Sequence, residues 1–263
     1  SGFGHGIGFS QWGAHAMAKA GMTTEEIITH YFPQTTLSDV ADNFDMHVGL
    51  QSRISKLTLR LASIDAGDAQ WTLVASSGEK VTIPEGATVS FKYTASNDKV
   101  QATFKNAPDA SLPAAEVITV YWSGARNASK YALGDLATKI QVIGPGETSA
   151  TGRWYRYGYL RVAGVAASTA SDGSVKAAGL TVSNSLRLHD EYLYGLGEVP
   201  SSWPANALQA QVIAARGYAY NKAYSSGTLR KRSVECDCTI QDGANDQVFV
   251  GYSKLAEAAG PRW

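Results

Sequence analysis

The sequence predicts an α+β fold that is predominantly β, with one central buried helix and an inserted all-β module. Two patterns support this prediction. Apolar and polar residues alternate over a long middle stretch, as in half-buried strands, and a segment near the C-terminus has apolar residues at helical spacing. In addition, 44% of the residues are hydrophobic, which is enough to build a large core. Three regions are expected: residues 1–40, 45–145 and 150–263.

Residues 1–40 combine a glycine-rich start with two expected helices. Glycine occupies alternate positions in GFGHGIGF, so the backbone can pass close to another element or to a ligand. Helical spacing of the apolar residues predicts a first helix after this block, which ends at Gly21. The sequence TTEEIITHYF predicts a second helix that is capped by Thr23 or Thr24 and ends before Pro33.

Residues 45–145 are expected to form the all-β module. Apolar and polar residues alternate in KLTLRLAS, WTLVASS, EKVTIPEG, TVSFKYTAS, KVQATFKN and VITVYWSG. Turn-forming residues separate these stretches at intervals of about ten residues. The pattern is compatible with a sandwich and with a barrel. No catalytic constellation lies within it, so a structural or glycan-positioning role is expected.

Residues 150–263 begin with two expected strands, WYRYGYLRVAG and GLTVSNSLRL, followed by a short helix or turn in DEYLYGLGEV. A helix from about Pro204 to Tyr224 is the clearest element of the chain, and Ser201 or Ser202 is the expected cap. Small residues dominate the apolar face of this helix. Such a face allows close approach to other backbone, which indicates a central buried position.

Composition excludes some function classes. Lys and Arg number 23, as do Asp and Glu, so no net field would attract nucleic acid or an acidic membrane. No apolar run reaches the roughly 20 residues that span a bilayer, and the N-terminus lacks the form of a signal peptide. The 13 Tyr and 6 Trp suit sugar recognition, although most are expected in the core.

The chain has two cysteines, Cys236 and Cys238, in VECDCTIQ. A local disulfide, two free thiols and half of a zinc site all fit this spacing. Because no nearby histidine completes a zinc ligand set, we predict no metal and no cofactor.

Glu198 is the candidate for chemistry. It follows Gly195 and Gly197, whose backbone freedom permits a sharp turn, and precedes Pro200, which restricts the exit of that turn. A carboxyl held in this way, and kept protonated near neutral pH, could act as a general acid. The structural alternative is that Glu198 caps the following helix or pairs with Arg216.

Three segments resemble the stage II sporulation protein D family, also called the SpoIID/LytB domain. The longest is YLYGLGEVPSSWPANALQAQVIAARGYAY, and the others are GHGIGFSQWGAHAMAKAG with ITHYFPQTTL, and DQVFVGY. Together they cover about the first 37 and the last 110 residues, with the β module between them. The resemblance implies a SpoIID-like catalytic domain, with a further strand-rich portion expected after Trp263.

The resemblance also implies a lytic transglycosylase that cleaves the MurNAc–GlcNAc bond of peptidoglycan, with Glu198 as the catalytic residue. Glu198 would protonate the glycosidic oxygen and then accept the proton of the muramic acid C6 hydroxyl, which gives a 1,6-anhydro end. Ordinary hydrolysis uses a second carboxylate, and the motif contains no evident one. The substrate-binding residues expected are His5, Ser10, Gln11, Tyr192, Trp203, Gln211 and Arg216.

Alternatives remain open at this point. His5, Ser10 and Gln11 could belong to a tight packing element and not to a cleft. Some positions depart from the family pattern, such as Gly217 where Thr is usual. The second function considered is a glycan-binding enhancer of a cell-wall amidase, and the third is a structural wall-binding protein. In each case the resemblance implies a secreted, extracellular or wall-associated bacterial protein.

Overall fold

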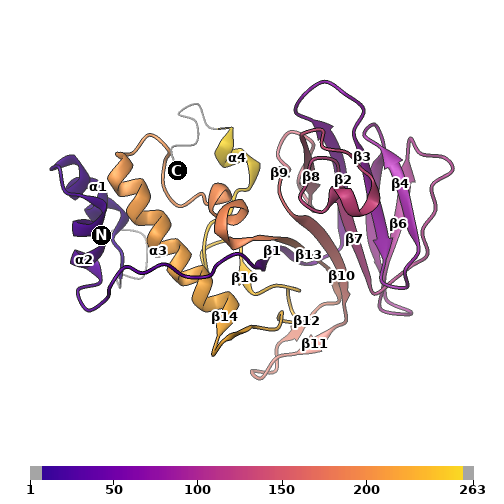
Figure 1. The fold of residues 1–263 in the computed structure, drawn as a ribbon. Coiled ribbons are helices and arrows are strands. Elements are labelled where there is room, and N and C mark those ends of the chain that lie inside the picture. The colour runs from indigo at the N-terminus through magenta and orange to yellow at the C-terminus, as the bar shows by residue number, and fades with distance from the viewer. Residues whose placement is uncertain (1–7, 257–263) are drawn as a thin grey trace.

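The computed structural model describes residues 8–256, and its fold is α+β and mostly β, as the sequence predicts. Strands make up one end of the molecule, the helices α1 and α2 make up the other, and the long helix α3 lies between them (Figure 1). Within residues 8–256, no helix combines the length and the apolar character needed to cross a bilayer.

Seven strands form the larger sheet, in the order β16, β1, β13, β10, β7, β3, β4. Neighbours are antiparallel except for β1 and β16, which are parallel. The bounds are β1 Asp45–Ile54, β3 Gln70–Ala75, β4 Lys80–Pro84, β7 Val117–Trp122, β10 Tyr159–Val165, β13 Gly179–Arg187 and β16 Ile240–Gln241. The sheet thus joins the middle of the chain to a strand near its C-terminal end.

Five strands form the smaller sheet, in the order β6, β5, β2, β8, β9. Their bounds are β2 Lys56–Ser63, β5 Thr88–Thr94, β6 Lys99–Lys105, β8 Thr138–Ile143 and β9 Arg153–Tyr155. Trp71 and Trp122 of the larger sheet share one buried cluster with Phe91 of the smaller sheet, so the two sheets pack as a sandwich. Only Ser55 separates β1 from β2, so one extended segment crosses from sheet to sheet.

The strands expected from alternating polarity are confirmed. The predicted boundary between residues 45–145 and 150–263 falls inside the larger sheet, because β10 pairs with β7 and β13 pairs with β1. The division of the chain into domains stays a prediction. Two short hairpins complete the β structure: β11 Ser168–Thr169 with β12 Val175–Lys176, and β14 Tyr224–Ser225 with β15 Thr228–Leu229.

Helix α3, Ala205–Ala223, confirms the long helix expected near the C-terminus. One side of it meets α1, Gln11–Lys19, and α2, Thr24–Tyr31, through a buried cluster that includes Ala210 of α3. Another side contributes Ala215 and Ala219 to the main core. The small side chains permit this close packing on both sides. The shorter helices are η1 Ala128–Tyr131, η2 Leu188–Tyr192, η3 Leu193–Gly195 and α4 Tyr252–Leu255.

The helix caps were predicted with mixed success. Thr23 caps α2 in a reciprocal capping box with Glu26, as expected. The prediction that Ser201 or Ser202 caps α3 is wrong, because Pro204 is the N-cap residue and no side chain bonds there. The two serines belong instead to the turn before the helix, in which the Trp203 N–H donates to the Pro200 carbonyl at 3.2 Å.

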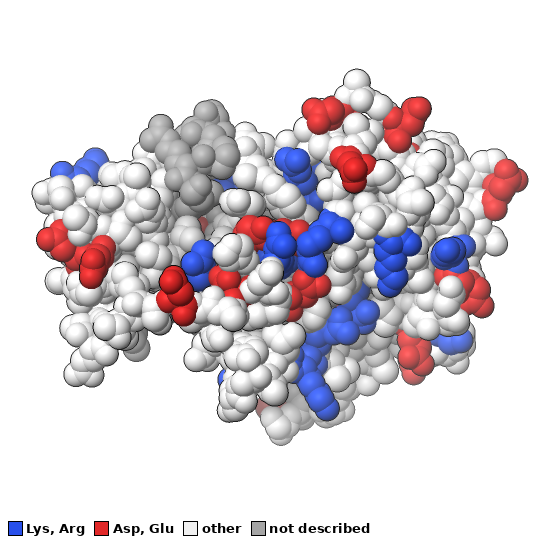
Figure 2. Space-filling model, viewed as in Figure 1, with Lys and Arg blue, Asp and Glu red and all other residues white. Residues whose placement is uncertain are grey.

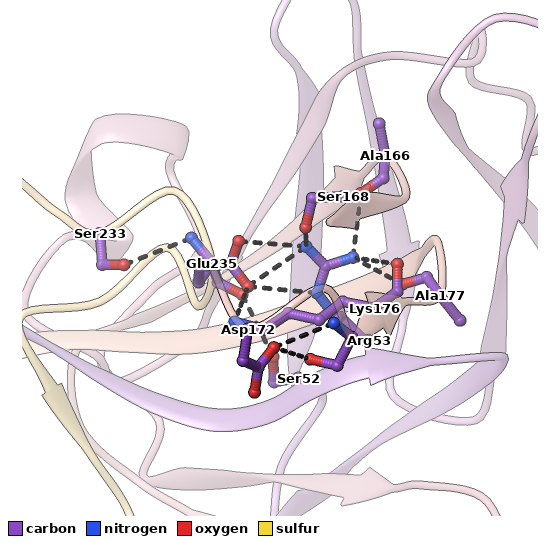
Figure 3. Close-up of polar contacts among 10 residues, drawn as sticks. Ser52, Arg53, Ala166, Ser168, Asp172, Lys176, Ala177, Ser233 and Glu235 are labelled. Carbon is purple, nitrogen blue, oxygen red and sulfur yellow. Dashed lines mark hydrogen bonds and ion pairs between the residues drawn. The ribbon is translucent and has the colours of Figure 1, made fainter. Parts of the chain in front are cut away.

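Cys236 and Cys238 form a disulfide with each other, so the local bridge is the alternative found. Three acidic residues in and beside this CDC segment each pair with an arginine from a strand of the larger or smaller sheet. The pairs are Arg53–Glu235 at 3.2 Å, Arg161–Asp237 at 2.7 Å and Arg153–Asp242 at 2.5 Å. Figure 3 shows the first, where Arg53 also donates to the carbonyls of Ala166 and Ala177. The ion pairs tie the C-terminal segment to the sandwich.

The turn before α3 packs tightly against residues 248–251. The Gly197 N–H donates to the Val248 carbonyl, and the Val250 N–H donates to the Gly195 carbonyl, each at 2.8 Å. A Cβ on Gly195 would lie 2.3 Å from the Phe249 ring, and one on Gly197 would lie 2.8 Å from Val250. Only glycine therefore permits this approach of the two backbones.

Alanine substitutions should distinguish this constrained glycine from an unconstrained one. Gly195→Ala is expected to lower the free energy of unfolding by about 1–3 kcal/mol, because the Phe249 ring must move. Gly217→Ala is the matched control: it lies in α3 with no atom within 4 Å of the added Cβ, so about 0.5–1 kcal/mol of stabilisation is expected. Urea unfolding measures both. Equal effects of the two substitutions would contradict the packing described.

The protein is expected to lose stability in acid because His47 is partly buried. Burial lowers its pKa from 6.5 to about 4, and the Arg232 charge adds to this effect. The unfolded chain therefore binds the proton near pH 6.5 and the folded protein only near pH 4, so stability falls as the pH falls through this window. The expected loss is on the order of 3 kcal/mol.

Unfolding at pH 7 and pH 4 measures this contribution when the parent is compared with His47→Gln. The variant should lose less stability on acidification than the parent. His30→Gln, at an exposed position of α2, serves as the control and should behave as the parent does. If the parent and His47→Gln respond to pH alike, His47 is not the group responsible.

Candidate functional site

Glu198 is half-buried and is held by two segments that are distant in the sequence. The side-chain amide of Gln11 donates to Glu198 Oε2 at 3.0 Å, and the backbone N–H of Val248 donates to Oε1 at 2.7 Å. Each carboxylate oxygen thus has one donor, and the orientation of the group is fixed. The structural alternatives for Glu198 do not hold, since no side chain caps α3 and Arg216 pairs with Asp42 at 3.3 Å.

Local structure explains how these donors reach the carboxylate. Ser10 caps α1 by accepting a hydrogen bond from the Gly13 N–H at 3.2 Å, which places Gln11 in the first helical position. The close packing of Gly195 and Gly197 on residues 248–251 brings the Val248 N–H to the turn that carries Glu198. Three segments with unrelated local structure therefore meet at one carboxyl group.

Three aromatic rings form a cluster, and each belongs to a segment that also carries Gln11 or Glu198. Trp12 follows Gln11, and its ring centroid lies 5.0 Å from that of Trp203 and 5.5 Å from that of His15. His15 and Trp203 are 4.6 Å apart. Trp203 is only 8% exposed, whereas Trp12 is 71% exposed. The cluster therefore offers one open indole face on a buried support.

Trp12 and His15 were not among the residues predicted from the sequence. A usable signal was present, because Trp12 and His15 stand three positions apart on an expected helix and directly follow Gln11. The partner ring, Trp203, belongs to another segment about 190 positions away, which no local pattern reveals.

Two of the predicted binding residues lie elsewhere. Tyr192 is fully buried, donates its hydroxyl to Gln247 Oε1 at 2.8 Å and stacks on Phe249. Its ring supports the core and has no surface for a glycan. Burial also raises the pKa of Tyr192 well above its usual value. Arg216 forms its ion pair with Asp42, a buried acid that also binds His189 at 2.7 Å.

The remaining predicted residues have the following positions. Gln211 is 7% exposed on α3, and its side-chain oxygen has no hydrogen-bond partner within residues 8–256. Ser10 uses its hydroxyl as a helix cap. His5 lies outside the described residues. Of the predicted set, the structure brings Gln11 into contact with Glu198 and places Trp203 in the cluster with Trp12 and His15.

The site is suited to proton transfer at one carboxyl group. Glu198 is partly exposed, and the two donors fix its orientation without placing a cation on it. Such a group can give a proton to a ligand and take one back. Within residues 8–256, no three His, Cys, Asp or Glu side chains gather in a way that could hold a metal ion.

Comparison with known proteins finds similarity in the C-terminal part of the chain. Residues 176–262 match the family model for the stage II sporulation protein, SpoIID. A stretch of 43 residues is 51% identical to stage II sporulation protein D of Bacillus subtilis (strain 168) and covers 16% of this chain and 12% of that protein. The corresponding protein of Bacillus amyloliquefaciens is 46% identical over 43 residues, with the same coverage.

The aligned part thus spans about one eighth of the length of each relative. No solved structure matches the chain significantly. The matched region contains the Glu198 turn, helix α3 and the segment that donates to Glu198. By these matches, residues 176–262 are similar to the SpoIID family.

Proposed function

We propose that this protein is a lytic transglycosylase that cleaves the MurNAc–GlcNAc bond of peptidoglycan glycan strands. The similarity of residues 176–262 to the SpoIID family suggests a cell-wall-related function. The observation that carries the finer proposal is the convergence on Glu198: an N-terminal helix and the segment after the CDC loop each donate one hydrogen bond to its carboxylate.

Glu198 acts as acid and then as base in this proposal. As an acid it gives its proton to the glycosidic oxygen, and the C1–O bond to the leaving sugar breaks. As a carboxylate it then takes the proton of the muramic acid C6 hydroxyl, whose oxygen bonds to C1. The products are a 1,6-anhydro end and a free 4-hydroxyl, and the glutamic acid is restored. The partners of Glu198 within residues 8–256 are an amide and a backbone N–H, which suits a reaction in which one carboxyl group is both acid and base.

The aromatic cluster supplies a surface for the glycan. The exposed face of Trp12 can pack on a pyranose ring, while Trp203 and His15 hold the indole in place. Gln11 joins the two parts of the site, because it binds Glu198 and precedes Trp12 in the chain. A sugar stacked on Trp12 would thus lie at the start of α1, where Gln11 donates its hydrogen bond to Glu198. The proposed location is the bacterial cell wall.

The decisive experiment digests purified glycan strands, with and without stem peptides, with the parent and with Glu198→Gln. The parent should yield 1,6-anhydro ends detectable by mass spectrometry. The variant should be slower by about 10²–10⁴-fold, the usual contribution of a general acid–base group. Glu25→Gln, which removes an exposed carboxylate of α2, is the matched control and should remain active. Equal activity of Glu198→Gln and the parent would refute the proposal. Strand binding without product from either protein would favour a non-catalytic amidase enhancer.

The stacking surface is tested by Trp12→Ala. Because Trp12 is largely exposed, the free energy of unfolding should change by less than about 0.5 kcal/mol. Loss of one aromatic–sugar contact should weaken binding to glycan strands by about 3–10-fold, measured by co-sedimentation at several protein concentrations. Val175→Ala, at a position that is 76% exposed on β12, should bind as the parent does. Unchanged binding by Trp12→Ala would exclude Trp12 from the glycan surface.

A further inference from the structure

An open hollow of about 540 Å³ lies between the loop that follows β15 and the end of β10. This volume is within the range of small-ligand sites, roughly 300–1,000 Å³. The lining residues are His47, Ala163, Gly164, Val165, Leu229, Arg230, Lys231, Arg232, Ser233, Val234 and Asp237. None of them contacts Glu198, and the loop follows the C-terminal end of α3, whereas Glu198 precedes its N-terminal end.

The hollow is strongly cationic in a chain with no net charge. Arg230, Lys231 and Arg232 line it in succession, and Asp237 is its one acidic lining residue. Asp237 is already neutralised, because it pairs with Arg161 at 2.7 Å and with Arg232 at 3.4 Å. The lining residues and these ion-pair partners therefore carry four cations and one carboxylate, an excess of three positive charges. Figure 2 shows Lys and Arg side chains gathered around β12, in the lower centre of the view.

Two of these cations have no acidic partner. Arg230 and Lys231 are exposed, and within residues 8–256 neither forms an ion pair. The nearby acid Glu235 is not available to them, since Arg53 and Lys176 both bind it at 3.2 Å (Figure 3). His47 adds no charge at neutral pH, because burial lowers its pKa to about 4.

The loop that carries the cations is anchored at both ends. At one end the Arg230 N–H donates to the Ala223 carbonyl at 2.8 Å, which ties the loop to the end of α3. At the other end the Ser233 N–H donates to the Cys238 carbonyl at 2.7 Å, within the disulfide-bridged CDC segment. A ligand would therefore meet backbone that is already ordered, which lowers the entropy cost of binding.

We infer that this hollow is a binding site for oxyanions, taking ligands that carry several carboxylate or phosphate groups. Arginine presents paired N–H groups that match both chemistries. Leu229 and Val234, which are 51% and 84% exposed, form an apolar rim beside the cations. The site is separate from the proposed glycan-cleaving centre.

The test uses two probes, tripolyphosphate for the phosphate source and propane-1,2,3-tricarboxylate for the carboxylate source. Each is titrated into the parent by calorimetry at low and at physiological salt. Saturable binding of at least one probe, weakened by salt, is expected, and the tighter probe identifies the source. Absence of saturable binding by both probes would overturn the inference.

Two double variants localise the site. Arg230→Gln/Lys231→Gln removes the unpaired cations and should raise the Kd at least tenfold. Lys56→Gln/Lys92→Gln is the matched control, because these exposed residues lie opposite each other on β2 and β5 and the change in net charge is the same. The control should shift the Kd less than twofold. Equal shifts in both variants would attribute the binding to overall charge and overturn the inference. Thermal unfolding checks that both variants are folded.

Discussion

The close approach of two glycine-containing backbones is the constraint on which the site depends. Gly195 and Gly197 leave no side chain between the turn and residues 248–251, so two backbone hydrogen bonds of 2.8 Å form there. The Val248 N–H reaches Glu198 only because of this contact. The same contact places Phe249 between Tyr192 and Tyr155. Core packing and the orientation of the Glu198 carboxylate thus both require glycine at positions 195 and 197.

Much of the fold could be predicted because local patterns determine it. Alternating polarity identified the strands, and Thr23 with Glu26 identified the start of α2. The pairing of strands could not be predicted in this way, since β1 finds its partners β13 and β16 far along the chain. The cap of α3 was mispredicted because serine is a strong general cap former, whereas here the turn at Pro200 ends directly at Pro204.

The candidate site likewise contains residues that the sequence could predict and residues that only the fold brings together. Glu198 became the candidate because glycine and proline mark its turn and because its segment resembles the SpoIID family, and its catalytic role stays a prediction. The predicted residue Gln11 does contact it. Tyr192 was predicted to bind substrate, but the sequence does not show which way its ring points. In the structure the ring is buried and fills the core against Phe249. Trp12, which we propose as a glycan surface, was not predicted because its support, Trp203, is close only in the folded chain. Total charge likewise concealed the cationic hollow, because a balanced count says nothing about where charges gather.

The position of β1 between two later strands of the larger sheet has a consequence for synthesis of the chain. β1 is flanked by β13 and β16, and its residue Ile54 pairs with Leu180, which the ribosome adds 126 positions later. Until then both edges of β1 lack their partners, and open edges attract other strands. The smaller sheet can begin earlier, since β2 pairs with β5. A nascent chain that stalls before β13 would therefore expose an aggregation-prone strand next to a partly formed sheet.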